Sequence, residues 1–369
     1  MTGDCRGCLG DIECTSGVCS ESTGSCIAAS SSLFVAVGGD DNGACDQADP
    51  CATVSRALTL VDATHYAIAV GDGAYLDSFI IDGPANVLIS GAGSKTTGGT
   101  TGTGGNATFT FTSGGGTYDH VIEVRTGSVV LEGVTLAEAS TEDVRIQGGA
   151  SLTLYKVDVQ SSKTGAIDCA ASSTVHLIQS IVHGSGISEP AVMVSGGMLI
   201  IERSQITNNA GGGLRINNLA SYQITNSFIT LNGGATTTAP AVDLRGSSLS
   251  PMDQFAFNTI AENQAGGAMT VHAGAECASN GPLADSIFAS NDVSGACTAN
   301  YTLYDNGVLN GNNNLSGDPQ FIGGANFHVS GGSPAIDNAD PTSTNMIDFD
   351  GDARPHGSAS DIGADEYVP

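Results

Sequence analysis

Ser204-Gln205-Ile206-Thr207-Asn208-Asn209 is a six-residue segment that returns along the chain. Related forms occur at residues 227–232 (Ser-Phe-Ile-Thr-Leu-Asn), 258–263 (Asn-Thr-Ile-Ala-Glu-Asn) and 286–291 (Ser-Ile-Phe-Ala-Ser-Asn). The apolar residue at its third position continues upstream, so that apolar anchors stand at 136, 159, 182, 206, 229, 260 and 288, separated by 23, 23, 24, 23, 31 and 28 residues. A period of this size is typical of a repeat architecture.

The residues between the anchors decide which kind of repeat this is. Each unit contains short β-branched runs with alternating character, such as residues 191–194 and 198–201, bounded by Gly, Asn and Ser. A leucine-rich repeat would show helical spacing, which these units lack. We therefore predict an all-β fold, a right-handed single-stranded parallel β-helix, with coils stacked at about 4.8 Å. Because one coil cannot bury its own apolar side, the core exists only in the stack.

An asparagine closes each of the clear repeats, at Asn209, Asn232, Asn263 and Asn291. Asparagine tolerates the left-handed backbone of a tight corner, and its amide can bond to its copies one coil away. We interpret these residues as a structural corner ladder, in preference to a polar binding strip.

The charge balance limits the partners that the protein can have. The chain carries 11 basic and 38 acidic residues, a formal charge of −27. Such a chain repels phosphate backbones, which argues against nucleic acid as a partner, and it repels acidic glycans unless cations intervene. Calcium is the expected small partner. The sequence contains no 18-residue apolar run, so no membrane span is predicted.

Cysteines indicate an oxidising compartment. Five of the ten lie in the first 26 residues, a density typical of a small disulfide module, which we place at residues 1–29. Zinc binding by Cys5 and Cys8 is the less favoured alternative. Spacing alone does not fix connectivity, but the expected disulfides are Cys8–Cys19, Cys14–Cys26, Cys45–Cys51 and Cys277–Cys297. The predicted location is secreted, either extracellular or at the cell surface.

The remaining chain divides into a solenoid, residues 30–332, and an acidic closing segment, residues 333–369. At the start of the solenoid, Val54, Leu58 and Val61 follow a helical spacing within residues 52–64. We predict an amphipathic helix there that caps the first coil, because an uncovered coil invites edge pairing.

The closing segment contains an acidic turn, Asp348-Phe349-Asp350-Gly351-Asp352, with Asp361 further on. Carboxylates at a spacing of two around a glycine turn are typical of calcium loops, although the final bidentate glutamate of a full loop is absent. We therefore predict a calcium site at Asp348, Asp350, Asp352 and Asp361. An equally weighted alternative is a capped turn in which Arg354 pairs with an aspartate.

Two motifs carry a family resemblance. The closing segment reads Ser-Pro-Ala-Ile-Asp-Asn at 333–338 and Ser-Asp-Ile-Gly-Ala-Asp-Glu-Tyr at 360–367, around the acidic turn. It resembles the end of secreted bacterial right-handed parallel β-helix proteins of the choice-of-anchor or pectate-lyase-like group. The leader, with Ser-Gly-Val-Cys at 16–19 and Gly-Ser-Cys at 24–26, is similar to those of secreted myxobacterial proteins. The resemblance implies fold and secretion but no particular reaction.

No catalytic residue can be assigned from sequence motifs. The motifs of hydrolases that resemble polygalacturonase (Asn-Thr-Asp, Asp-Asp and Gly-His-Gly) are missing from the coils. Arg203, Arg215 and Arg245 lie in successive coils and could form a line with Asp243 and Glu202, for which surface ion pairs are the favoured interpretation. A polysaccharide lyase or glycoside hydrolase acting on acidic glycans is the alternative function.

The residue preceding each anchor points away from the core. Three of these seven residues are large and apolar, namely Ile181, Phe228 and Ile287. Either another part of the chain covers them or a second molecule binds there. We therefore predict a secreted structural or adhesive protein, stabilised by calcium, that self-associates through this face or contacts an extracellular glycan.

Overall fold

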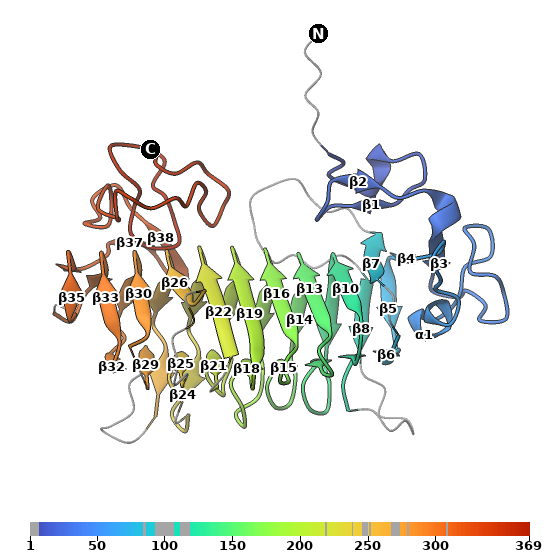
Figure 1. Cartoon of the computed structure of the whole chain (residues 1–369), viewed down its shortest axis with the longest axis horizontal. Coiled ribbons are helices and arrows are strands. Elements are labelled where there is room, and N and C mark those ends of the chain that lie inside the picture. Colours follow the sequence, from blue (N-terminus) through green and yellow to red (C-terminus); the bar gives the residue numbers. More distant parts are fainter. Residues whose placement is uncertain are drawn as a thin grey trace, which may run out of the picture.

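The computed structural model describes residues 7–369 apart from 84–85, 93–106, 111–118, 218–219, 238, 246–249, 251, 267–273, 279 and 308. Its main body is a row of stacked coils, each contributing strands to three long parallel sheets (Figure 1). The chain is thus a parallel β-helix, as the repeat predicted.

The three sheets contain the following strands in spatial order. Sheet I consists of β3 (Ser32–Val35), β4 (Ala67–Gly71), β7 (Asn86–Ala92), β10 (Ser128–Glu132), β13 (Ser151–Tyr155), β16 (Thr174–Ile178), β19 (Gly197–Glu202), β22 (Ala220–Thr225), β26 (Gln254–Ala256), β30 (Pro282–Ala284), β33 (Thr298–Asn300) and β35 (Gly311–Asn312). Sheet II consists of β5 (Gly73–Tyr75), β8 (Ala107–Thr110), β11 (Val134–Ala137), β14 (Asp158–Gln160), β17 (Ile181–His183), β20 (Gln205–Thr207), β23 (Phe228–Thr230), β27 (Thr259–Ala261), β31 (Ile287–Ala289), β34 (Leu303–Tyr304) and β36 (Leu315–Ser316). Sheet III consists of β6 (Phe79–Ile81), β9 (Ile122–Val124), β12 (Val144–Ile146), β15 (Ile167–Cys169), β18 (Val192–Val194), β21 (Leu214–Ile216), β25 (Val242–Leu244), β29 (Ala275–Cys277) and β32 (Val293–Gly295).

The apolar anchors form one internal file along sheet II. Each pairs with its copy one coil away, from Leu136 opposite Val159 to Ile260 opposite Phe288. All seven side chains are completely buried. The repeat period read from the sequence therefore predicted the strand register correctly.

The closing asparagines form a hydrogen-bonded ladder inside the corner between sheets II and III. Nδ2 of Asn209 donates to Oδ1 of Asn232, Asn232 donates to Asn263, and Asn263 donates to Asn291, at 2.9, 3.0 and 2.7 Å. The expectation of left-handed backbone at these asparagines is wrong, because the positive φ falls on the preceding residue, as at Leu231 (φ 58). The asparagine contributes its amide to the ladder, and its neighbour makes the turn.

Replacing Asn232 with Ala is expected to destabilise the protein measurably. The change leaves the backbone amide of Asn209 without a partner in a buried corner, and it removes two further hydrogen bonds, one from Nδ2 of Asn209 and one to the Ile206 carbonyl. Each orphaned group costs about 1–3 kcal/mol. The melting temperature should fall clearly, whereas the same change at the exposed Asn306 should leave it nearly unchanged. Equal shifts in the two variants would contradict a structural ladder.

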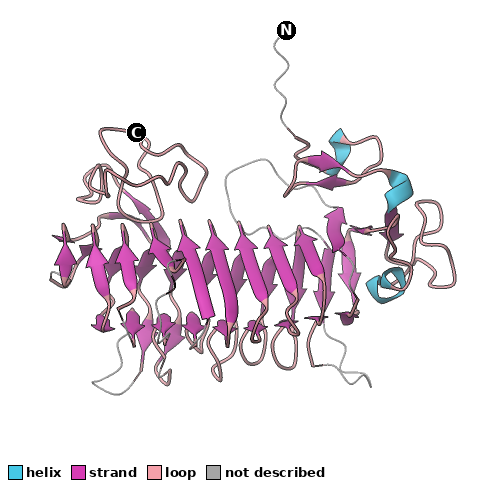
Figure 2. Cartoon of the chain, viewed as in Figure 1, coloured by secondary structure: helices cyan, strands magenta, loops and turns pink. Residues whose placement is uncertain are grey.

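The predicted amphipathic helix is shorter than expected. Helix α1 spans Val54–Leu58, with Thr53 as its N-cap accepting a hydrogen bond from the Arg56 amide. The helix ends early because tight turns at residues 59–61 follow it, and Asp62 then accepts hydrogen bonds from the Thr64 and His65 amides, a local turn that competes with helical bonding. Figure 2 shows α1 at the N-terminal end of the solenoid. Its role as a cap stays a prediction.

The cysteine-rich leader is attached to the outside of sheet I. It contains the short antiparallel strands β1 (Cys19–Ser20) and β2 (Ser25–Cys26), which the disulfides Cys8–Cys19 and Cys14–Cys26 join to the preceding residues. Glu132, at the end of β10, is fully buried and accepts hydrogen bonds from the Glu21 and Ser22 amides. Further along the chain, disulfides join Cys45 to Cys51 and Cys277 to Cys297. All four pairs coincide with those expected from the spacing.

The last part of the chain folds back over the outside of the solenoid, where Figure 1 shows it in red. An antiparallel hairpin, β37 (Phe321–Gly323) and β38 (Asn326–Val329), leads into the closing segment. Phe327, Phe349 and Ile362 from this region share an apolar cluster with Phe228 and Ile287 of sheet II. The covered face of sheet II is therefore a second core, outside the coils.

Candidate functional site

The acidic turn does not form the predicted four-carboxylate calcium site. Asp348 is fully buried, and its carboxylate accepts hydrogen bonds from the amides of Gly351, Asp352 and Glu366 at 2.7–3.0 Å. Asp361 likewise accepts from the amides of Asp337 and Tyr367, both at 2.7 Å. These two carboxylates bind backbone within the segment, so their oxygens are already used.

The other two aspartates lie apart from this network. Asp352 is exposed, and Asp350 contacts His328 at 3.0 Å. The alternative expectation, an aspartate paired with Arg354, is close to what is found, but the partner is Glu366. Calcium binding by the protein stays a prediction, and the acidic turn itself is explained by its backbone hydrogen bonds.

The predicted assembly face is covered. Phe228 is only 4% exposed and Ile287 is fully buried, both beneath the hairpin and closing segment. Ile181 is partly exposed and lines a cavity of about 380 Å³ at the edge of this cover. Of the two explanations for these apolar residues, coverage by the chain itself is therefore correct for two of the three. Self-association was predicted because these apolar residues were expected to be exposed, and Phe228 and Ile287 are not.

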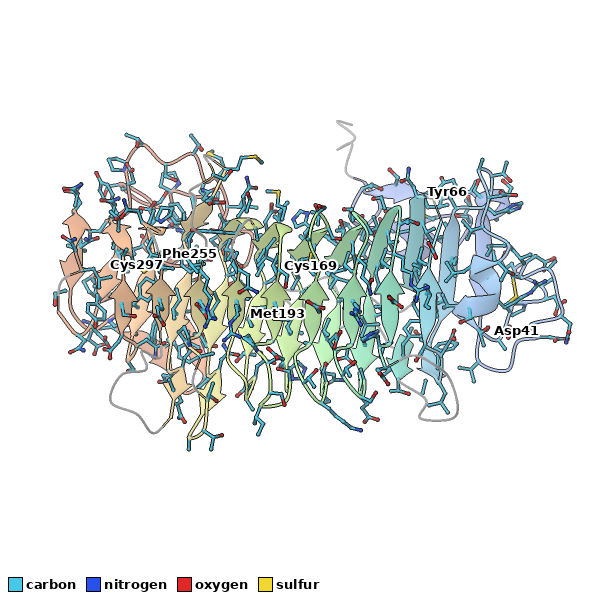
Figure 3. All side chains as sticks on the ribbon, turned by 60° about the horizontal axis from the view of Figure 1, so that its bottom comes forward. Asp41, Tyr66, Cys169, Met193, Phe255 and Cys297 are labelled. Carbon is cyan, nitrogen blue, oxygen red and sulfur yellow. A yellow bond between two sulfur atoms is a disulfide. The ribbon has the colours of Figure 1, made fainter. Side chains whose placement is uncertain are left out.

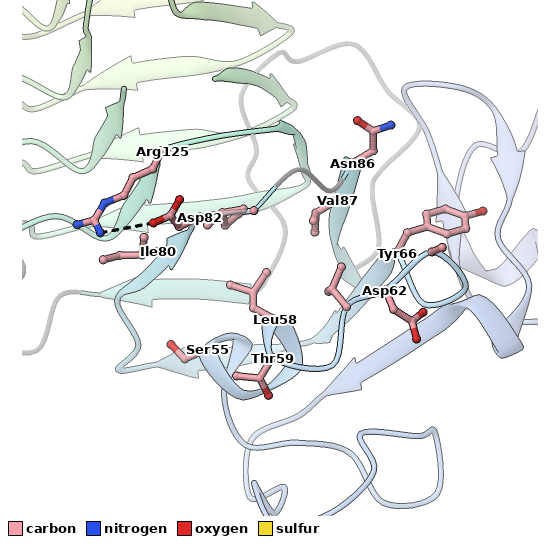
Figure 4. A pocket seen from close by; sticks show the side chains of 14 residues that line it. Ser55, Leu58, Thr59, Asp62, Tyr66, Ile80, Asp82, Asn86, Val87 and Arg125 are labelled. Atoms are coloured by element: carbon pink, nitrogen blue, oxygen red, sulfur yellow. Dashed lines mark ion pairs between the residues drawn. The ribbon is translucent and has the colours of Figure 1, made fainter. Parts of the chain in front are cut away.

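A larger cavity, of about 1110 Å³, lies beside α1 at the N-terminal end (Figure 4). Its walls include Leu58, Ile80 and Val87, with Asp82 and Arg125 at the rim, where the two charges lie 3.9 Å apart. The other carboxylate there, Asp62, is bound to backbone amides of its own turn. This cavity presents no reactive group from among its described lining residues.

A row of charged side chains runs along the outer face of sheet III. In each strand the first and third residues point into the core and the middle residue points outward. The register aligns these middle residues in one file: Glu123, Arg145, Asp168, Met193, Arg215, Asp243 and Glu276. We call this file the charged row, and Met193, labelled in Figure 3, lies near its centre.

Loops from sheet II deepen the middle of this row into a cleft of about 290 Å³. Asp168 and Met193 form part of its lining, and the loops contribute Glu142 and Glu189. Three carboxyl groups thus line one small depression, together with the hydroxyl-bearing residues Thr141, Thr164 and Ser188. We refer to this depression as the cleft.

Asp168 is the unusual carboxyl group of the cleft. Burial raises its pKa above the ordinary value, and the nearby Glu142 carboxylate raises it further, against the opposing effect of Arg145. Among the described residues, no hydrogen bond or ion pair engages its side chain. A half-buried carboxyl group with a raised pKa and no partner can hold a proton and release it to a bound molecule.

Arginines flank the cleft on both sides. Arg145 Nη1 lies 3.2 Å from His120 Nε2 and its Nε lies 4.0 Å from Glu142. Because a guanidinium can only donate, His120 Nε2 is the acceptor and its proton sits on Nδ1. Arg215 donates to Asp243 at 3.0 Å and also approaches Glu189 at 3.9 Å.

The sequence suggested only part of this arrangement. Arg215, Asp243 and Arg245 do form the expected surface ion pairs, with Asp243 accepting from both arginines. Arg203 lies elsewhere, at the corner after β19, where it donates to the Phe349 carbonyl. Asp168 and Arg145 were missed. The signal that could have found them is the middle residue of each sheet III strand, spaced by 22–28 residues between Glu123 and Asp243.

Asp143 stabilises the loops that form the wall of the cleft. It is fully buried, next to Glu142 in the chain, and its carboxyl group bonds the Ala139 amide and the Ser162 hydroxyl. Burial raises its pKa to about 7. The side chain therefore joins two successive loops of the cleft wall.

Acidification from pH 8 to 5.5 is expected to raise the melting temperature. The folded protein holds the Asp143 proton up to about pH 7, whereas the ordinary pKa is 3.8, so stability is lost as pH rises between these values. Asp285, whose pKa burial raises to about 6, adds in the same direction. An Asp143→Asn variant should show a flatter profile in calorimetry. A melting temperature that falls on mild acidification would contradict this assignment.

Comparisons with known proteins bear on the fold. In the described part of the chain, no helix has the length and apolar character that crossing a bilayer requires. No protein-family model matches the chain, and no curated protein does. One similar solved structure is described as "Crystal structure of pectate lyase Pel9A", with a TM-score of 0.57, 14% sequence identity, and coverage of 91% of this chain and 96% of that chain. At this identity the likeness shows the fold, a parallel β-helix consistent with the right-handed solenoid predicted from the sequence.

Proposed function

We propose that the protein is an extracellular polysaccharide-cleaving β-helix that binds an acidic glycan along the charged row and breaks it in the cleft. The observation that carries the proposal is Asp168, an unpaired carboxyl group with a raised pKa at the centre of the row. The pectate lyase fold of the similar structure supports the same class of substrate.

The distribution of positive charge supports binding of an acidic polymer. Four of the chain's 11 basic residues lie on or directly after strands of sheet III: Arg125, Arg145, Arg215 and Arg245. Arg145 and Arg215 are three strands apart, about 14 Å at roughly 4.8 Å per strand. An extended polyuronate lying along the row reaches both guanidinium groups, each of which can bind a sugar carboxylate through two parallel hydrogen bonds.

The carboxyl groups support hydrolysis as the reaction. Protonated Asp168 donates its proton to the glycosidic oxygen as the bond breaks, leaving an aspartate next to Arg145. Glu142 or Glu189 acts as base on a water that attacks the anomeric carbon, or attacks that carbon itself, since glycoside hydrolases work with such a pair. In the second case water then hydrolyses the glycosyl ester, with Asp168 acting as base. β-Elimination would need a basic side chain instead, and the nearest lysine in the chain is the exposed Lys163, beside Thr164 of the cleft.

Four disulfides support an extracellular location, where they form and persist. Placement in the choice-of-anchor group, or among myxobacterial proteins, rests on the sequence resemblance alone. A purely structural or adhesive role has lost its main argument, since the closing segment covers Phe228 and Ile287.

The test is to incubate the full chain with galacturonate and mannuronate–guluronate polymers, a methyl-esterified polyuronate, and a neutral β-glucan. We expect new reducing ends from the free polyuronates, slower release from the esterified polymer, and none from the glucan. Ultraviolet absorbance of an unsaturated product would identify β-elimination and would make Lys163 the candidate base. Binding without cleavage would indicate an adhesive module. A protein that neither binds nor cleaves any of the acidic polymers would refute the proposal.

A further inference from the structure

Where the hairpin meets the closing segment, a histidine and two aspartates converge. His328 belongs to β38, and Asp350 and Asp365 come from the closing segment. One ligand atom of each lies within 4.8 Å of the other two. The cysteine group at Cys8, Cys14 and Cys19 is the other such cluster among the described residues, but disulfides already occupy those sulfurs.

The ring of His328 is held in one orientation. It packs against both Phe228 and Phe349, with ring centroids 5.1 and 6.0 Å away. Its Nδ1 contacts Oδ1 of Asn326, which also accepts the His328 amide at 3.0 Å. An amide oxygen can only accept, so Nδ1 carries a proton. Metal-binding histidines typically have one ring nitrogen donating to an oxygen in this way, which leaves the other free as a ligand.

The remaining nitrogen, Nε2, faces carboxylates. It lies 3.0 Å from Oδ2 of Asp350. Two acceptor atoms repel at this distance unless a cation neutralises them, either a proton on Nε2 or a metal ion. Asp365 adds a second carboxylate and is only 7% exposed.

We propose that His328, Asp350 and Asp365 bind a single divalent metal ion of the zinc type. Neighbouring ligand atoms on tetrahedral zinc lie roughly 3.3 Å apart when the bonds are 2.0–2.1 Å long, and the observed separation of Nε2 and Oδ2 is close to this. An imidazole ligand favours zinc, cobalt or nickel over calcium and magnesium, which prefer all-oxygen sites. Water completes the coordination, because Asp350 and His328 are partly exposed and His328 lines the 380 Å³ cavity.

The metal would join the hairpin to parts of the closing segment that lie more than 20 residues further along the chain. The hairpin and the closing segment together cover Phe228, and the ion bridges them directly above that residue. This site goes beyond the proposed glycan chemistry, because it lies on sheet II and the cleft lies on sheet III. It also replaces the predicted calcium loop, sharing Asp350 with it.

Calorimetric titration of the full chain with Zn²⁺, Ca²⁺ and Mg²⁺ after treatment with a chelator tests the proposal. We expect one Zn²⁺ per chain, no comparable Ca²⁺ or Mg²⁺ binding, and a Co²⁺ adduct with a visible absorption band. His328→Gln and Asp350→Asn should each weaken Zn²⁺ binding at least tenfold. His183→Gln is the matched control, because His183 forms a pair with Asp158 alone at 2.9 Å.

The outcomes are decisive in both directions. Loss of binding in the His328 and Asp350 variants, with binding retained in the His183 variant, supports the site. Absence of Zn²⁺ binding, or equal binding in all variants, overturns it and leaves a His328–Asp350 ion pair only. Glycan cleavage by the metal-free protein is independent of this result, so the two proposals fail separately.

Discussion

Asp168→Asn is expected to reduce glycan cleavage by about 10²–10⁴-fold, the usual contribution of a positioned general acid. Asparagine has nearly the same shape but carries no proton that it can give to the glycosidic oxygen. Because burial disfavours the charged form of Asp168, removing the charge should not lower the melting temperature. Rate loss without stability loss separates a catalytic role from a structural one.

Glu262→Gln is the control for this change. Glu262 is an exposed carboxylate at the corner after β27, outside both the charged row and the cleft. The variant should cleave at the rate of the unchanged protein. In addition, the alkaline limb of the pH–rate profile should disappear in the Asp168 variant, since that limb reports loss of the donated proton. A variant that keeps activity within a few-fold would exclude Asp168 as the acid.

Arg354→Met is expected to cost about 3–5 kcal/mol, because it leaves one partner of a buried ion pair without the other. Both side chains of the Arg354–Glu366 pair are inaccessible to solvent, at 3.0 Å. The guanidinium also donates to the carbonyls of Asp361 and Gly363, each at 2.8 Å, and lies over the Phe257 ring at 4.7 Å. It therefore holds the closing segment together against Phe257 of the solenoid, alongside direct hydrogen bonds from the Asp340 amide to Asp285 and from the Ala364 amide to Thr259.

The expected damage is local release of the closing segment. The coils pair mainly with their neighbours, so the solenoid can persist when its cover is lost. Hydrogen exchange should accelerate in residues 333–369, and the exposure of Phe228 and Ile287 should make the protein self-associate. Arg245→Met is the control, because its side chain is 53% exposed and its partner Asp243 keeps a second ion pair, with Arg215.

Two further variants refine this test. Arg354→Lys keeps the charge but lacks the planar fork, so an intermediate loss is expected. Replacing Arg354 and Glu366 together by apolar residues should cost less than Arg354→Met alone, because no uncompensated buried charge remains. If Arg354→Met melts and exchanges like the unchanged protein, the segment is held by its apolar contacts instead.

Prediction from the sequence succeeded where an interaction links a residue to its copy in the next coil. The anchors from Leu136 to Phe288 and the asparagine ladder from Asn209 to Asn291 are of this kind. It predicted α1 too long, because tight turns at residues 59–61 end the helix. Calcium binding at the acidic turn stays a prediction, since Asp348 and Asp361 bind backbone amides there. The sequence left open what covers Phe228, because the cover comes from more than 90 residues away.

The sequence by itself determined the solenoid, its register and its corner ladder. These depend on short, periodic relations between neighbouring coils, which a one-dimensional pattern records directly. Only the tertiary structure decided that sheet II is covered, that Asp168 lies unpaired in a cleft, and that His328 meets Asp350 and Asp365. These features depend on burial and on contacts between distant segments, and no periodic pattern encodes how deeply a side chain is removed from water.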